Sequence, residues 1–371
     1  MTKPAELPVL PDHAAGCVAN VVPALVAPGA ACVPPAWFPR SVEGARQVVL
    51  FVVDGLGWNQ LGQRPAVAPV LHGLDGGAIT TVVPSTTATA LTSITTGLQP
   101  GEHGIVGYRF PVKGEILNTL RWTTPSGDAR NRIPPHRTQP VPAFLGGNVP
   151  VVTKAEFASS GFSGVHLAGA RQVGYRTVST LLVEVRRLLA AGERLVYVYY
   201  DGIDKVAHEY GFGEHYDAEL GFVDRLVGDL RSLLPAEAAL LVTADHGQVH
   251  VGGAVRYLDA AVRSLLTQQS GEGRFRWLHT RAGAAADLEA AALAAHGHEA
   301  WVVGVDTVVA EGWLGSTVTP AARGRLGDVA LVARLPVSFD DAADTGAFDL
   351  VCRHGSLTAD EMLVPLLAAR R

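Results

Sequence analysis

The sequence predicts an α/β fold, a three-layer α/β/α sandwich with a mostly parallel central sheet and a small inserted cap. Near-continuous runs of β-branched and aromatic residues recur along the chain, and each leads into polar residues. Such runs are typical of parallel strands that are buried on both faces. Helical patterns lie between them, and this alternation indicates helices packed against one sheet. A chain of 371 residues, 48% of them hydrophobic, is long enough to bury such a core.

Three strands and two helices carry this prediction. The strands are expected at 47–53, 194–200 and 239–243, and the helices at 179–191 and 216–234. Each of the three strands leads into acidic residues. In open parallel sheets, ligands bind beyond the carboxyl ends of the strands. We therefore expect a functional site at this edge of the sheet.

The whole chain, 1–371, is expected to form a single domain whose core is interrupted twice. The core is expected at approximately 45–107, 150–250 and 344–371, and the insertions at approximately 108–149 and 251–343. The first insertion is rich in Pro, Arg and Thr, which predicts an irregular loop region. The second contains an Ala-rich helical pattern at 284–295 and a strand pattern at 328–333, which predict a smaller cap.

The composition excludes several classes of protein. The formal net charge is −5 and no cluster of Lys and Arg is present, so a nucleic-acid polymer is not an expected partner. Cys17, Cys32 and Cys352 are too scattered for a disulfide framework or a zinc ribbon, and they fit a reduced, cytoplasmic setting. The apolar segment 14–38 is interrupted by prolines and follows no basic region, so we expect neither a signal peptide nor a membrane partner. The oligomeric state is left open.

Acidic residues and histidines after the predicted strands form a candidate set of metal ligands. Asp54 follows the first strand directly, although an Asp at this position can equally cap a helix. Asp204 and His208 have the spacing that places both side chains on one face of a helix, which Gly211 would end. The same spacing also occurs by chance. The nearby Asp201 is either a supporting residue or a turn residue.

Three further candidates follow later in the chain. Asp245 and His246 are adjacent at a strand end, where both can face one cation, although an Asx turn with a solvated histidine is the simpler alternative. His354 alone would be an ordinary surface or core histidine. Together, the carboxylates and imidazoles suit two divalent cations, zinc or, as a harder substitute, manganese. Two such ions would bridge a phosphoryl group and stabilise the attacking and leaving oxygens.

A hydroxyl-rich segment between these ligands supplies the candidate nucleophile. Pro84 is expected to end a strand, and a helix is expected to begin near Thr87 and to stop at Gly97. The unpaired N–H groups and the dipole at a helix N-terminus bind phosphate and favour an alkoxide. On this segment alone, helix capping by Thr87 or its neighbours is the better interpretation.

The order of these residues resembles the alkaline phosphatase superfamily and, within it, the type I phosphodiesterase/nucleotide pyrophosphatase family. The matched blocks are scattered over approximately 48–365. The ordered set is Asp54, Thr87, Asp204-x-x-x-His208, Asp245-His246 and His354. The nucleophile region is similar in its spacing, with Pro84-x-x-Thr87 followed by Thr96-Gly97-Leu98-x-Pro100-x-x-His103-Gly104-Ile105.

This resemblance implies an alkaline phosphatase-like catalytic domain that hydrolyses phosphoric esters as a phosphodiesterase or nucleotide pyrophosphatase. The implied ligands of one metal are Asp204, His208 and His354. The implied ligands of the other are Asp54, Asp245, His246 and the oxygen of Thr87. Thr87 would attack phosphorus in line, and water would hydrolyse the resulting phosphothreonine. Ligation of the Thr87 oxygen by a metal ion matters because a threonine hydroxyl is too weakly acidic to ionise unaided. The implied partner is a small phosphorylated substrate, with a nucleotide among the candidates.

One departure from the family pattern bears on the substrate. Nucleotide pyrophosphatases of this type carry an asparagine shortly after the nucleophile, whereas this chain has Ala88, Thr89 and Ala90 there. Stabilisation of the phosphoryl oxygens is then left to backbone N–H groups, a capping residue or the metals. Phosphomonoesterase, phosphonoacetate hydrolase and phosphomutase activities of the same superfamily therefore stay open. A non-catalytic binding protein is the alternative from another class.

The residues that would contact the leaving group cannot be read from the sequence. Arg109, Arg121, Trp122 and Arg353 are candidates, and each is equally suited to a surface or packing role. His103 is expected to be structural, because it completes a loop and lies outside the ligand set.

Overall fold

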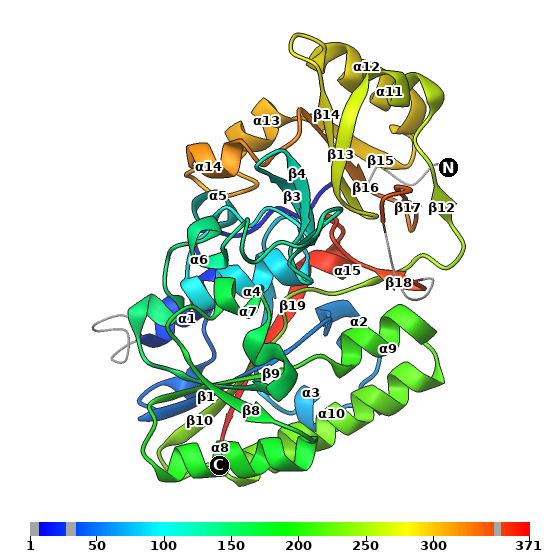
Figure 1. Cartoon of the computed structure of the whole chain (residues 1–371). Helices are drawn as coiled ribbons and strands as arrows, with labels where there is room; N and C mark the ends of the chain where they lie inside the picture. The colour runs from blue at the N-terminus through cyan, green and yellow to red at the C-terminus, as the bar shows by residue number, and fades with distance from the viewer. Residues whose placement is uncertain (1–6, 27–34, 345–349) are drawn as a thin grey trace.

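The structure, a computed structural model, describes residues 7–26, 35–344 and 350–371. The strands of its central sheet are β1 (Gln47–Val53), β2 (Asp75–Thr80), β7 (Pro150–Lys154), β8 (Arg171–Tyr175), β9 (Leu195–Tyr200), β10 (Ala238–Thr243) and β19 (Leu363–Arg370). They lie in the order β2-β19-β10-β1-β9-β7-β8 (Figure 1). The neighbours from β10 to β8 are parallel, whereas β19 is antiparallel to both β10 and β2. The predicted mostly parallel α/β fold is confirmed.

The central strands are buried on both faces, as their sequences predict. Every residue of β10 is buried, and in β1 only Gln47 is partly exposed. Adjacent side chains point to opposite faces of a strand, so an unbroken apolar run needs helices on both sides of the sheet. The three strands expected from the sequence match β1, β9 and β10 to within one residue at each end.

Helices supply the two outer layers (Figure 1). On one side, α8 (Val178–Ala190) packs against β7, β8 and β9, and α10 (Glu214–Ser232) packs against α8 and β10. The buried positions of α10 include Tyr216, Leu220, Val223 and Val227, which form one apolar stripe along the helix. On the other side lie α1 (Val21–Val26), α4 (Thr87–Thr96) and α7 (Ser163–His166).

A second sheet is formed within residues 251–343. Its strands are β13 (Leu266–Glu272), β14 (Phe275–Thr280), β15 (Ala300–Gly304) and β16 (Val329–Ala333), and they pair antiparallel in the order β13-β14-β16-β15. Two helices, α11 (Ala260–Leu265) and α12 (Ala285–His296), pack with it. In β16, Ala330 and Val332 join the main hydrophobic core, whereas Val329, Leu331 and Ala333 join a separate cluster with α12. This alternation places the small sheet between the main core and its own helices.

Residues 108–149 contain more regular structure than the sequence predicts. Four short strands form an antiparallel sheet: β3 (Arg109–Val112), β4 (Glu115–Asn118), β5 (Thr123–Thr124) and β6 (Gly127–Asp128). Trp122 is fully buried and donates its Nε1–H to the carbonyl of Ile133 at 2.7 Å. Strands this short give too few alternating positions to be recognised from the sequence.

The remaining elements are short, apart from α9, which carries two of the candidate ligands. They are α2 (Trp58–Gly62), α3 (Pro69–His72), α5 (Pro100–His103), α6 (Pro135–Thr138), α9 (Gly202–Tyr210), β11 (Val249–His250), β12 (Val255–Arg256), α13 (Val305–Ala310), α14 (Pro320–Arg323), β17 (Ser338–Phe339), β18 (Cys352–Arg353) and α15 (Ala359–Met362). Cys17 and Cys352 are buried, and Cys32 lies outside the described residues. Within the described ranges, no helix has both the length and the apolar character needed to cross a membrane.

His103, the last residue of α5, is buried in a neutral form. The N–H of Ile105 donates to His103 Nδ1 at 3.0 Å, so Nε2 carries the proton and donates to Ser93 Oγ at 2.9 Å. Burial, with a smaller contribution from the charge of Arg325, lowers the pKa of His103 to about 3. These contacts agree with the structural role expected from the sequence.

Replacing His103 tests this burial. Because the folded-state pKa lies below the ordinary value of 6.5, the unfolded chain binds more protons, and stability falls as the pH falls below 6.5. At about pH 5 this one group should account for a loss of about 2 kcal/mol. His103→Gln should therefore lose less stability than the wild type between about pH 7 and about pH 5 in urea unfolding. An equal loss in the two proteins would contradict the buried neutral imidazole.

Candidate metal centre

Thr87 is the first residue of α4. Thr86 precedes it in an extended conformation, with φ −128° and ψ 146°, and makes no side-chain capping bond. Gly97 ends the helix in the left-handed region, with φ 73°. The helix therefore begins and ends where the sequence predicts. Thr87 itself is almost buried, with its hydroxyl at the positive end of the helix dipole.

The side chain of His246 faces Thr87 and two carboxylates. Its Nδ1–H donates to the carbonyl of Gly247 at 3.0 Å, which leaves the Nε2 lone pair free. His246 Nε2 lies 3.0 Å from Thr87 Oγ1. The same nitrogen lies 3.4 Å from Asp54 Oδ1 and 3.5 Å from Asp245 Oδ2. Asp54 follows β1, Asp245 follows β10, and these strands are neighbours, so adjacent strand ends bring the group together.

The hydrogen bonds of the two aspartates leave one oxygen of each unsatisfied. Asp54 Oδ2 accepts from the hydroxyl of Tyr199, and Asp245 Oδ1 accepts from the backbone N–H groups of Gly55 and His246, each at 3.1 Å. Asp54 Oδ1 and Asp245 Oδ2 are buried and have no hydrogen-bond partner within the described part of the chain. Both of these atoms face His246 Nε2. Buried carboxylate oxygens without donors fit a cation between them.

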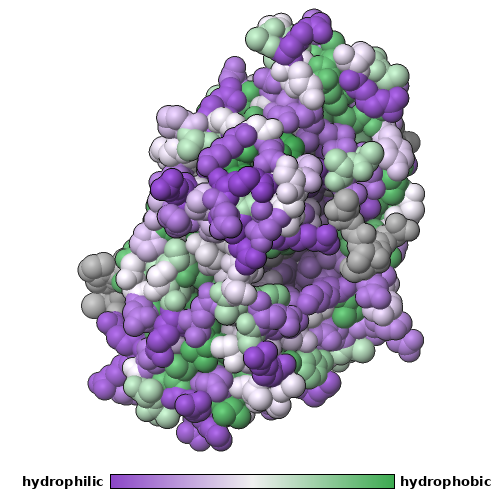
Figure 2. Space-filling model, in the orientation of Figure 1, coloured by the Kyte–Doolittle hydropathy of each residue, from purple (hydrophilic) through white to green (hydrophobic). Residues whose placement is uncertain are grey.

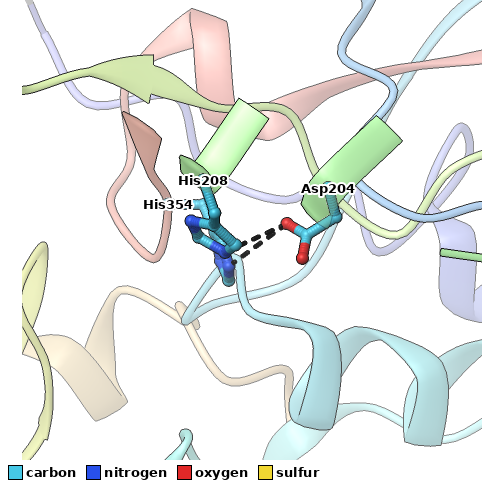
Figure 3. Close-up of side chains that lie close together, drawn as sticks. All are labelled: Asp204, His208 and His354. Atoms are coloured by element: carbon cyan, nitrogen blue, oxygen red, sulfur yellow. Dashed lines mark ion pairs between the residues drawn. The ribbon is translucent and has the colours of Figure 1, made fainter. Parts of the chain in front are cut away.

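Asp204, His208 and His354 form a second group (Figure 3). Asp204 and His208 project from α9, and His354 follows β18. Asp204 Oδ1 lies 3.2 Å from His208 Nε2 and 3.8 Å from His354 Nε2. The Nδ1–H groups of His208 and His354 donate to the carbonyls of Cys352 and Ser85, at 2.7 and 3.1 Å. Each imidazole therefore turns an unprotonated Nε2 toward Asp204, as metal-ligating histidines do.

The two groups are contiguous. The rings of His246 and His354 stack with centroids 3.6 Å apart and planes 14° apart. Within each group, the candidate ligand atoms all lie within 4.8 Å of one another. The structure thus brings together all six side chains that the sequence singles out, with Thr87 beside one group.

The electrostatics of the site are those of crowded buried carboxylates. Burial, followed by the charges of Asp245 and Asp204, raises the pKa of Asp54 well above its ordinary value. Burial likewise raises the pKa of Asp245. Burial alone would also raise the pKa of Asp204, but in the metal-free chain a protonated His208 lowers it through its charge and its hydrogen bond. Burial and the charge of His246 lower the pKa of His354 well below its ordinary value. A bound cation would relieve the repulsion among these carboxylates.

A cavity of about 230 Å³ adjoins Thr87, Asp54 and Asp204. Many of its lining residues are aromatic or apolar, and they include Leu91, Leu120, Phe157, Phe162, Tyr197 and Tyr199. Polar side chains at Asp201 and Lys205 also line it. Figure 2 shows the surface hollowed across the middle of the molecule, between hydrophilic residues. The cavity has room for a small organic group attached to a phosphoryl group held at Thr87.

Most of the candidate substrate contacts named from the sequence have other partners. Arg109 pairs with Asp344, and Arg353 pairs with Asp340 at 2.9 Å. Trp122 is packed in the core, and Arg121 is exposed next to the cavity-lining Leu120.

Asp201 pairs with two lysines, of which Lys205 lines the cavity. Its Oδ1 lies 2.6 Å from Lys154 Nζ, and its Oδ2 lies 2.7 Å from Lys205 Nζ. This position beside the cavity fits a supporting residue better than a simple turn residue.

Three residues of the site were not found by sequence reasoning. Tyr199 donates to Asp54, and Gln248 Nε2 donates to Asp204 Oδ1 at 2.7 Å. Glu272, at the end of β13, lies 3.9 Å from His354 Nδ1. Only Gln248, close behind Asp245-His246, had a position in the sequence that could have drawn attention to it.

Comparison with known proteins identifies one family model. The model of type I phosphodiesterase / nucleotide pyrophosphatase matches residues 48–357. The search of the curated proteins found no match.

Solved structures with the same fold include hydrolases. Murine ectonucleotide pyrophosphatase / phosphodiesterase 5 is similar at 17% identity and a TM-score of 0.64, with 88% of each chain covered. Another structure of that protein is an inactive form in complex with AMP. Phosphonoacetate hydrolase from Sinorhizobium meliloti 1021, in complex with phosphonoformate, is similar at 19% identity and a TM-score of 0.67. The match covers 88% of this chain and 91% of that one. At these identities the likeness shows the fold.

The buried charge of Asp54 can be tested with and without metal. Because its folded-state pKa is raised, the ionised carboxylate destabilises the metal-free fold increasingly as the pH rises above 3.8. At neutral pH, Asp54→Asn should raise the free energy of unfolding of the metal-depleted chain by on the order of 1 kcal/mol. Added zinc should stabilise this variant less than the wild type. Thermal unfolding with chelator and with zinc measures both effects.

Asp224 provides a matched control. It is also buried, but both of its oxygens accept from backbone N–H groups, those of Val70 and Leu71. Asp224→Asn should destabilise the chain with or without zinc, because it weakens the hydrogen bonds that the carboxylate already accepts from the backbone. If Asp54→Asn behaved in the same way, a charge-crowded cation site at Asp54 would be ruled out.

Proposed function

The chain belongs to the type I phosphodiesterase / nucleotide pyrophosphatase family and is a hydrolase acting on phosphoric ester bonds, and on this premise we propose that Thr87 is its nucleophile. We further propose that it acts with two divalent metal ions, zinc or manganese, on a small phosphorylated substrate. A nucleotide is one such substrate. The proposed activity is that of a phosphodiesterase.

One observation carries the proposal. Thr87 Oγ1 lies 3.0 Å from His246 Nε2, the same atom that faces the unsatisfied oxygens of Asp54 and Asp245. A hydroxyl used only to cap a helix would bond to a backbone N–H of its own first turn, but α4 has no side-chain capping bond. The position of Thr87 therefore supports a chemical role over a capping role.

Backbone groups can replace the asparagine that the sequence lacks. Ala88, Thr89 and Ala90 are buried in the first turn of α4. The amides of Thr87, Ala88 and Thr89 have no backbone acceptor among the described residues, and the first bonded amide is that of Ala90, which donates to Thr86. Free amides at a helix N-terminus donate to phosphoryl oxygens. This arrangement supports phosphoryl binding without an added side-chain amide.

The proposed reaction has two steps. Thr87 Oγ attacks phosphorus and loses its proton, while the bond from phosphorus to the leaving oxygen breaks and that oxygen gains a proton. Water then attacks the phosphothreonine, and the bond from phosphorus to Oγ breaks with return of a proton to Thr87. Helix-terminal amides stabilise the negative charge on the phosphoryl oxygens in both steps.

The residues present fit the two metals that this reaction needs. One set is Asp54, Asp245, His246 and Thr87, and the other is Asp204, His208 and His354. When bound, the metals supply positive charge that lowers the pKa of the Thr87 hydroxyl and compensates the departing oxygen. The chain itself holds each imidazole in the tautomer that leaves Nε2 unprotonated.

A second candidate is supported by the charges in the cavity wall. Lys205 lines the cavity, and its Nζ lies 2.7 Å from Asp201 Oδ2. This ammonium group can pair with a leaving group that carries its own negative charge. Phosphonoacetate, the ligand of another structure with this fold, has such a group. Phosphonoacetate hydrolysis is therefore the second candidate function.

Replacing Thr87 tests the nucleophile. Thr87→Ala should raise the activation free energy by on the order of several kcal/mol and so abolish turnover. The reason is that no other hydroxyl contacts His246 Nε2 among the described residues. Metal content should persist. Intact-mass analysis after an acid quench should show a phosphate adduct on the wild type only. Thr92→Ala is the control, since the Thr92 hydroxyl donates only to the carbonyl of Ala88 in the same helix. Turnover of Thr87→Ala close to that of Thr92→Ala would exclude the proposed role.

Substrate preference tests the two candidates against each other. Turnover should be compared for bis(p-nitrophenyl) phosphate, p-nitrophenyl phosphate and phosphonoacetate with zinc or manganese. A phosphodiesterase should prefer the diester, and Lys205→Met should change its rate little, because the p-nitrophenyl group is uncharged. A phosphonoacetate hydrolase should release phosphate from phosphonoacetate, and Lys205→Met should lower that kcat/KM by about tenfold or more. Failure with every substrate despite bound metals would favour a binding protein.

A further inference from the structure

We propose that Gln248 positions Asp204 for metal binding, an inference that rests on the proposed function. Gln248 Nε2 donates to Asp204 Oδ1 at 2.7 Å. That oxygen is the one that faces the imidazoles of His208 and His354. Gln248 stands close behind His246 of the other group in the chain. One backbone segment therefore presents a proposed ligand to one metal and holds a proposed ligand of the other.

The surroundings of Gln248 are built to hold this side chain in one place. The residue is fully buried, and its carbonyl accepts from Gln60 Nε2 at 2.6 Å. It leads directly into β11 (Val249–His250), which pairs with β18 beside His354. The backbone of Gln248 is therefore fixed from both directions.

Gly55 leaves the space through which Gln248 reaches Asp204. A Cβ at position 55 would lie 2.6 Å from Gln248 Nε2 and 3.0 Å from the Cα of Asp204. Gly55 also has a φ of 74°, which favours glycine. The turn after β1 thus places Asp54 in one metal group and opens the path by which Gln248 supports the other.

An amide suits this position better than a charged side chain would. A lysine would compete with the cation for the charge of Asp204, and a glutamate would repel it. The neutral amide orients the carboxylate and leaves its negative charge available. The other amide atom, Oε1, is buried and has no hydrogen-bond partner among the described residues. An apolar residue would avoid this unsatisfied atom, so the contact with Asp204 is what the amide provides here.

Retention of zinc by the loaded full chain tests the proposal. Gln248→Met keeps nearly the same side-chain volume and removes the donor. The wild type should hold two zinc ions against a chromogenic chelator. The variant should release one of them about 10- to 100-fold more readily and keep the other as tightly as the wild type. Gln248→Leu serves the same purpose if the Met variant does not accumulate as folded protein.

Gln139→Met is the matched control. Gln139 is also fully buried, but its amide donates to the carbonyls of Val141 and Val165, away from any candidate ligand. This variant should lose thermal stability and keep both zinc ions at wild-type affinity. Two zinc ions held equally well by the wild type and Gln248→Met would overturn the role of Gln248 alone. Loss of both ions to the same degree would assign Gln248 a general structural role. A wild type without bound zinc or manganese would overturn the metal assignment itself.

Discussion

The site depends on bringing buried carboxylates close together at the end of the central sheet. Asp54 and Asp245 follow the neighbouring strands β1 and β10, and Asp204 enters from the first turn of α9 beside them. The N–H of Asp204 donates to the carbonyl of Asp54 at 3.1 Å, so the two acidic segments are joined by their backbones. Like charges at such positions destabilise the fold unless they are protonated or compensated.

The surrounding donors compensate only part of this charge. Tyr199 and the backbone amides of Gly55 and His246 satisfy one oxygen of each aspartate that follows a strand. The other oxygens stay buried and unsatisfied, and both face the unprotonated nitrogen of His246. The protein could have used a lysine or arginine here to neutralise the site. Unprotonated imidazoles stand there instead, which would leave the negative charge available for the two cations that we propose.

The sequence predicts those strands whose pattern of apolar residues matches their burial in the folded protein. The runs that became β1, β9 and β10 are apolar throughout because they are buried on both faces. In contrast, β2 contains adjacent glycines and is largely exposed, since it lies at the sheet edge. The sequence of such a segment does not distinguish a strand from a turn. The short strands of residues 108–149 were missed for a related reason, because pairing between them, rather than their own pattern, defines them.

Ligand chemistry restricts residue type and strand ends restrict position, and the family resemblance then completed the set of six candidate ligands with His354, which follows no predicted strand. Supporting residues face no such restriction. Tyr199 is one aromatic residue in an aromatic strand, and its hydrogen bond to Asp54 depends on the pairing of β9 with β1. Glu272 belongs to another sheet, and its nearness to His354 depends on how that sheet packs. A Cβ at Gly355 would meet the Glu272 side chain at 3.0 Å, so the loop that carries His354 leaves room for it. Such contacts arise only from the tertiary structure.

The packing of the small sheet therefore bears on the candidate metal centre. Arg274, in the turn between β13 and β14, forms a fully buried bidentate pair with Glu361 at 2.7 and 3.1 Å. Glu361 also accepts from the N–H of Ser356 at 3.0 Å, and its carbonyl accepts from the N–H of Gly247 at 2.9 Å. These two amides follow closely after His354 and His246. A buried ion pair contributes little net stability when its desolvation is counted, but its geometry is demanding. The pair is best understood as a device that fixes the two histidine loops relative to each other, so that residues 251–343 act as part of the support of the site rather than as a detachable cover.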